Sequence, residues 1–187
     1  MIDLRLGRYQ DTMADVTCDA LIVDAPYSAK THTGHAHAGI PRELGYSGWS
    51  AEDVSECVNF WHPRTRSWFL TITDHVLIPE WERELRAVGR YVFAPVPWVN
   101  TSMACRQQGD GPASSCCYIV AARPRESRFI GWGSLPGHYK GPGKKGSPVV
   151  GAKPDWLMQQ LIIHYSRPGD TVCDPCAGGG TTLLAAR

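Results

Sequence analysis

The sequence of 187 residues predicts an α/β fold with a largely parallel sheet. Short apolar runs with strand character alternate with segments of helical spacing, which is the pattern of this class. The first predicted strand, residues 19–24, is apolar throughout its interior, as in strands that are covered on both faces. The last one, residues 171–174, runs into a glycine-rich turn and then a helix. That sequence of elements is typical of α/β proteins that bind nucleotide-like ligands.

Four helices are predicted before the glycine-rich turn. Ser50, with Asp53 three residues later, predicts a helix that runs to about Trp61 and ends before Pro63. The apolar spacing within residues 65–77 (Trp68, Ile72, His75 and Val76) predicts a second helix. Pro79 suits the first turn of a third helix through residue 88, with Gly89 as its C-cap. A fourth opens at residues 153–155, and its apolar stripe is Leu157, Leu161 and Ile162.

The remaining segments are predicted as strands, loops and a terminal helix. Residues 90–94 and 116–121 are expected to be strands, and residues 28–49 a long functional loop. Residues 131–152 are rich in glycine, proline and lysine, a composition that argues against any regular element. A last helix is expected from Thr181 to Arg187.

Composition excludes several classes of protein. Apolar residues make up 43% and charged residues 20%, so the chain is not disordered, and one domain over residues 1–187 is expected. No run approaches 18 apolar residues and the N-terminus lacks a secretory signal, so a cytoplasmic protein is expected. Seven scattered cysteines favour reduced, mostly buried thiols. The formal charge is −4 over residues 1–122 but +6 over residues 123–153, which indicates an anionic partner for the basic segment.

Two segments carry chemistry. Asp24-Ala25-Pro26-Tyr27 follows the first strand, where a carboxylate, backbone carbonyls and an aromatic ring together can receive a planar group that bears an amine. Residues 174–182 (Asp-Pro-Cys-Ala-Gly-Gly-Gly-Thr-Thr) follow the last strand, and their glycines allow close approach of the backbone to a ligand. Taken singly, either segment is also compatible with an ordinary turn.

The two segments together resemble the beta group of DNA amino-methyltransferases. Asp24–Tyr27, Lys153-Pro154, Pro168-Gly169-Asp170 and the glycine loop match the family in order and spacing over essentially the whole chain. The resemblance implies a Rossmann-like sheet in permuted order and the cofactor S-adenosyl-L-methionine. It also implies catalytic roles for Asp24, Ala25, Pro26 and Tyr27. The cofactor residues that it implies are Lys153, Asp174, Pro175, Cys176, Gly178, Gly180, Thr181 and Thr182.

The sequence departs from the family pattern in four respects. Ala25 replaces a proline, which keeps the backbone carbonyl but loses its φ restraint. Cys176 replaces a phenylalanine and Gly179 a serine. The family also has a further strand with an acid that binds the ribose, and no such acid follows the glycine loop. We therefore expect the C-terminal strands to be missing, weak cofactor binding by residues 1–187, and a homodimer or a second chain that completes the fold.

The implied reaction is methylation of an exocyclic amino group of a DNA base. Adenine N6 is preferred over cytosine N4, because the motif begins with Asp. An RNA adenosine methyltransferase and a non-catalytic, nucleic-acid-binding remnant are the alternatives. The basic loop at residues 123–152 lies where the family has its target-recognition region. Its lysines, Lys140, Lys144 and Lys145, are expected to neutralise DNA phosphates unless the segment is only a solvated loop.

Histidines and tryptophans in the loops are further candidates. His32, His35 and His37 could hold a metal ion, but no carboxylate or cysteine lies within the cluster. A loop that covers the substrate is the preferred interpretation, and no metal is expected. Trp49 and Trp132 lie in predicted loops, where either could stack on a base.

Overall fold

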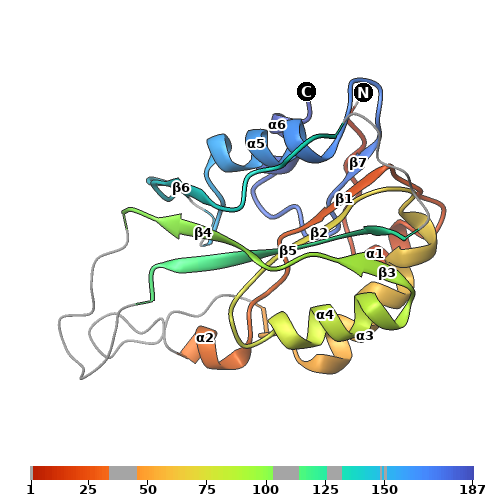
Figure 1. The fold of residues 1–187 in the computed structure, drawn as a ribbon, viewed down its shortest axis with the longest axis horizontal. Coiled ribbons are helices and arrows are strands. Elements are labelled where there is room, and N and C mark those ends of the chain that lie inside the picture. The colour runs from red at the N-terminus through yellow and green to blue at the C-terminus, as the bar shows by residue number, and fades with distance from the viewer. Residues whose placement is uncertain (1, 34–45, 103–113, 126–131, 148, 150) are drawn as a thin grey trace.

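The computed structural model describes residues 2–33, 46–102, 114–125, 132–147, 149 and 151–187 (Figure 1). The strands of this part are β1 (Ala20–Val23), β2 (Phe69–Thr73), β3 (Arg90–Val92), β4 (Val96–Asn100), β5 (Cys116–Pro124), β6 (Tyr139–Gly141) and β7 (Val172–Cys173). The helices are α1 (Tyr9–Thr12), α2 (Ala29–Thr33), α3 (Ala51–Trp61), α4 (Ile78–Ala87), α5 (Asp155–Tyr165) and α6 (Thr181–Ala185), with a 3₁₀ turn at His62–Arg64.

The described strands form one sheet in the order β6-β4-β5-β2-β1-β7, and β3 pairs with β5. Strand β1 is parallel to both β2 and β7, and β4 is parallel to β6. Strand β5 is antiparallel to β2, β3 and β4. The predicted α/β class is confirmed, and parallel pairing holds at β2-β1-β7, where the two chemical segments begin.

Helices cover both faces of the sheet (Figure 1). Alternate side chains of β1 face opposite sides of the sheet, because successive side chains of a strand point in opposite directions. Leu21 and Val23 pack with α3 and α4, whereas Ala20 and Ile22 pack with α5. Each face has its own apolar cluster, so β1 is buried along its whole length. This burial places the residues after β1 at the end of a rigid central strand.

Local signals account for most of the helix boundaries. The Ser50 hydroxyl and the Asp53 carboxylate form a reciprocal capping box at the start of α3, as the sequence predicts. Pro79 lies in the first turn of α4, and Gly89 follows its end with a φ of 83°. Helix α5 begins after Pro154 and buries Leu157 and Leu161 completely. These predictions are confirmed.

The helix predicted over residues 65–77 is wrong. Residues 69–73 form strand β2 instead, and all five are buried between β1 and β5. A central strand has apolar residues on both faces, so its sequence is apolar almost throughout. Apolar residues therefore also occur at the i, i+4 spacing that is expected of a helix. The β-branched residues Thr71, Ile72 and Thr73 favour the extended form. Helix α4 begins only at Ile78, after the turn at residues 74–77.

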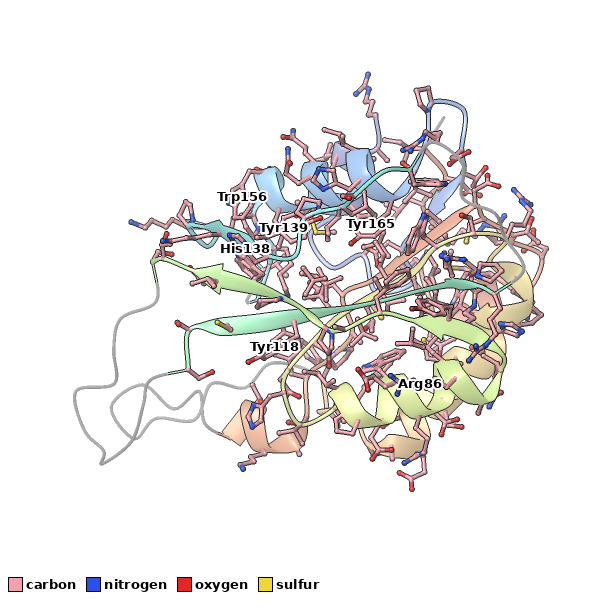
Figure 2. The ribbon with its side chains drawn as sticks, viewed as in Figure 1. Arg86, Tyr118, His138, Tyr139, Trp156 and Tyr165 are labelled. Atoms are coloured by element: carbon pink, nitrogen blue, oxygen red, sulfur yellow. The ribbon has the colours of Figure 1, made fainter. Side chains whose placement is uncertain are left out.

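Two strands lie where the sequence predicts none. Strand β4 contains Pro97, but β6 pairs only with the following residues, Trp98–Asn100. Strand β6 lies inside the segment expected to lack regular structure, and Tyr139 anchors it. The Tyr139 side chain is buried, and its hydroxyl lies 2.8 Å from Nδ1 of His164 on α5. Tyr139, Trp156 and Tyr165, labelled in Figure 2, belong to the apolar cluster on the face of the sheet that α5 covers.

Within the described residues, no helix combines the length and the apolar character that a membrane crossing requires.

Candidate functional site

The two chemical segments meet at one edge of the sheet. Strands β1 and β7 are parallel neighbours, with Leu21 beside Cys173, so Asp24 and Asp174 follow adjacent strand ends. They line a cavity of about 1570 Å³. The predicted site residues on its wall are Asp24, Ala25, Pro26, Tyr27, Lys153, Asp174, Pro175, Cys176, Gly178, Thr181 and Thr182. Of the predicted cofactor residues, Gly180 lies outside the lining and precedes α6 with a φ of 74°.

Asp24 faces the cavity from the end of β1. Its side chain is 19% exposed, and its Oδ1 atom is buried. The Lys153 ammonium lies 2.5 Å from this oxygen as an ion pair. Burial raises the pKa of Asp24, and the ammonium opposes that rise. The carboxylate is therefore an acceptor held at the cavity wall for a nitrogen donor.

Ala25 and Tyr27 complete the first segment. The Ala25 side chain packs into the apolar cluster under α3 and α4 and is buried there. The Lys153 ammonium lies 5.0 Å from the centre of the Tyr27 ring. Burial raises the pKa of Tyr27, as do the neighbouring Cys117, Asp24 and Asp74. The tyrosine therefore stays a neutral aromatic surface near neutral pH.

Asp174 organises the glycine loop. One carboxylate oxygen accepts the Cys176 amide at 2.9 Å, and the other accepts the Thr182 hydroxyl at 2.5 Å. The side chain is buried, and burial raises its pKa to about 7 despite these hydrogen bonds. Gly178 adopts a φ of 49°, which side chains rarely allow. The loop thus presents backbone and a buried acid to the cavity.

Asp74 supports the site from outside the cavity lining, and the sequence analysis missed it. It follows β2, and one of its oxygens accepts the Ser28 amide at 2.9 Å and the Ser28 hydroxyl at 2.6 Å, together with the Thr31 hydroxyl. Its other oxygen accepts the amides of Val76 and Leu77, each at 3.1 Å. Burial works to raise the pKa of Asp74, but the hydrogen bonds outweigh it and lower the pKa.

Asp74 therefore fixes the residue directly after Tyr27 to the neighbouring strand end. The signal for it was available in the sequence. Residues 69–73, taken as a strand rather than a helix, place Asp74 at the same sheet edge as Asp24.

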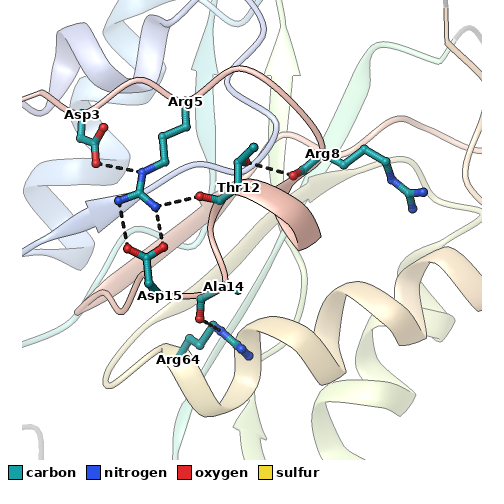
Figure 3. A network of polar contacts seen from close by, with 7 residues as sticks. All are labelled: Asp3, Arg5, Arg8, Thr12, Ala14, Asp15 and Arg64. Atoms are coloured by element: carbon teal, nitrogen blue, oxygen red, sulfur yellow. Dashed lines mark hydrogen bonds and ion pairs between the residues drawn. The ribbon is translucent and has the colours of Figure 1, made fainter.

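The N-terminal segment forms a further wall of the cavity. Residues 2–7 line it, and Arg5 holds them in place (Figure 3). The Arg5 guanidinium binds both oxygens of Asp15 at 2.5 and 3.2 Å, Asp3 at 3.0 Å and the Thr12 carbonyl at 2.7 Å. The guanidinium thereby ties this segment to the residues that precede β1.

The three lysines of the basic segment lie in different surroundings. Lys140 on β6 and Lys145 are exposed. Lys144 is paired with Asp155 at 2.7 Å and lies 3.4 Å from the Thr181 hydroxyl beside the glycine loop. Because Asp155 neutralises its charge, Lys144 is a weaker candidate for phosphate than the other two.

The aromatic candidates pack within the protein. The Trp49 ring stacks on Trp81 at 5.9 Å between centroids, and its backbone amide donates to the Tyr27 carbonyl at 3.0 Å. The guanidinium of Arg167 lies 3.6 Å from the centre of the Trp132 ring. Neither tryptophan lines the cavity, so the expected stacking on a base has no support there. His32 lies on α2, and His35 and His37 lie outside the described residues.

Comparison with known proteins gives similar solved structures only. The M1.HpyAVI complex with S-adenosylmethionine superposes with a TM-score of 0.66 at 20% identity, over 95% of this chain and 80% of the other. TTHA0409 from Thermus thermophilus, a provisionally assigned DNA modification methylase, superposes with a TM-score of 0.60 at 18% identity, over 97% of this chain and 82% of the other. No protein-family model and no curated protein matches. The chain therefore shares its α/β fold with these solved structures, one of which is a complex with S-adenosylmethionine.

Proposed function

We propose that the protein transfers the methyl group of S-adenosyl-L-methionine to an exocyclic amino group of a DNA base, with adenine N6 preferred over cytosine N4. The observation that carries the proposal is one cavity that joins a buried carboxylate oxygen, an aromatic ring and a glycine loop. The first two suit a flat base with an amino group, and the third suits a nucleotide-like cofactor.

The residues of the cavity fit the cofactor. Gly178 and Gly179 bring backbone to the wall, and Asp174 is a buried acid that a cationic group of the ligand would neutralise. Thr181 and Thr182 continue the lining, with Lys153 beside them on the same cavity. When bound, S-adenosylmethionine supplies an electrophilic methyl group on a sulfonium.

The chain's own contribution is positioning. The lone pair of an exocyclic base nitrogen is delocalised into the ring, which makes the nitrogen a poor nucleophile. Asp24 and the Ala25 carbonyl accept its N–H bonds and favour a more pyramidal nitrogen. Tyr27 stacks on the base once it has left the duplex.

Transfer of a labelled methyl group tests the proposal. The protein is incubated with tritiated S-adenosylmethionine and with duplex DNA or RNA of mixed sequence, and the nucleosides released by digestion are separated. We expect the label in N6-methyldeoxyadenosine. Label only in N4-methyldeoxycytidine overturns the base preference, label only in RNA overturns the substrate, and no label with either polymer overturns the activity.

We further propose that Lys140 and Lys145 bind DNA phosphates. Replacing both with Gln should weaken binding to every duplex about equally. It should also lower the slope of log K against log salt by up to about 2, because each phosphate contact contributes roughly 0.9. Fluorescence anisotropy between about 50 and about 200 mM salt measures the slope. Lys144→Gln is the matched control, and its slope should stay unchanged because Asp155 already pairs that lysine.

If the salt slope of the double variant is unchanged, Lys140 and Lys145 do not bind phosphates and their segment is only a solvated connector. A change in the sequence that is methylated would show that the segment reads bases.

A further inference from the structure

Lys153 lies among the atoms that the proposed function gives to the base. Its side chain is 9% exposed, and its ammonium is 2.5 Å from Asp24 Oδ1 and 5.0 Å from the centre of the Tyr27 ring. It also donates to the Gly151 carbonyl at 3.1 Å. A buried ammonium requires such partners, because an uncompensated charge is expensive to bury. Each contact therefore holds the lysine in this position.

The ammonium and a base amino group need the same partners. Both donate N–H to the Asp24 carboxylate, and both use the face of the Tyr27 ring, one by cation–π attraction and the other by stacking. A base stacked on that face would occupy the space that the ammonium now takes. The two therefore compete for a single acceptor site.

We propose that Lys153 occupies the base site of the unliganded protein and withdraws when a base enters. This inference rests on the proposed function and adds a residue that sets the affinity and the selectivity for the base. Only a planar ring with an N–H donor replaces both contacts of the ammonium. Asp174 also interacts electrostatically with Lys153, so the displaced ammonium keeps an acid partner within the cavity.

The occupied site lowers the apparent affinity for the base. Where only one molecule in about ten has its base site open, the apparent affinity falls about tenfold. Lys153→Met keeps an unbranched side chain of similar length and removes the charge and the donors. Adenine should bind this variant about tenfold more tightly than the wild type. Lys153→Arg keeps the charge and the donors, so adenine should bind it less tightly than it binds Lys153→Met.

The probes are adenine and N6,N6-dimethyladenine, which has the same ring but no amino N–H. Their binding to the wild type and both variants is measured by calorimetry. In parallel, the Lys153 ammonium signal of the ¹⁵N-labelled wild type is assigned by its loss in Lys153→Met. Adenine should shift this signal, and N6,N6-dimethyladenine should not shift it at equal concentration. The NMR measurement uses the unaltered protein, so it holds even if a variant folds poorly.

The outcomes separate this inference from the proposed function. Adenine that binds the wild type and Lys153→Met equally, with the ammonium signal unmoved, overturns the role of Lys153 and leaves the function standing. Adenine that binds neither protein overturns the base site, and the inference falls with it. Tighter binding by Lys153→Met together with a shifted ammonium signal supports both.

Discussion

Replacing Asp24 with Asn should slow methyl transfer severely while S-adenosylmethionine still binds with nearly unchanged affinity. Asp24 is the carboxylate that faces the cavity with a buried oxygen, and its proposed partner is the base rather than the cofactor. Loss of a charged acceptor aimed at the reacting nitrogen costs about a hundredfold to a thousandfold in rate. Tritium transfer to DNA measures the rate, and calorimetry measures cofactor binding.

Asp11→Asn is a suitable control for this experiment. It makes the same chemical change at an exposed position of helix α1, outside the cavity lining, and should leave turnover unchanged. Turnover like that of the wild type in Asp24→Asn would remove Asp24 from the mechanism. Loss of cofactor binding together with turnover would mean that Asp24 acts on the cofactor or on the fold.

The second large effect concerns Asp174 and pH. Burial raises its pKa from the ordinary value of 3.8 to about 7 in the folded protein, so the folded state binds more protons than the unfolded state between these values. The free energy of unfolding therefore falls as pH rises from about 4 to about 7. One group shifted this far contributes a change of about 4 kcal/mol. Ionised Asp174 thus destabilises the fold at neutral pH.

Asp174→Asn should remove this dependence. The amide oxygen can still accept from Cys176, and its NH₂ group can donate to the Thr182 hydroxyl, so the loop keeps its contacts. Urea denaturation of both proteins from about pH 4.5 to about pH 8 gives the difference in unfolding free energy, in which other titrating groups cancel. We expect the unfolding free energy of the variant to increase relative to that of the wild type as pH rises. A constant difference would show that Asp174 ionises normally.

Elements marked by local chemistry could be predicted from the sequence. The capping box at Ser50, the proline and glycine that bracket α4, and the apolar strand before Asp24 act over a few residues. Strand β2 was missed because its side chains are buried on both faces, a requirement set by its neighbours β1 and β5. Strand β6 was missed because its partner β4 is distant in sequence and its own composition is that of a loop.

For the candidate site, the sequence alone determined which segments bear chemistry and, through the alternation of strands and helices, that both lie at one sheet edge. Their order along the chain also suggested the kind of protein. Only the tertiary structure decided which groups touch. It pairs Lys153 with Asp24 and Lys144 with Asp155, and it joins Asp74 to Ser28 by a hydrogen bond. These contacts join residues from 11 to 129 positions apart, and no local pattern specifies them. Lys153, Asp24 and Asp74 are largely buried, so each of these charges needs a partner.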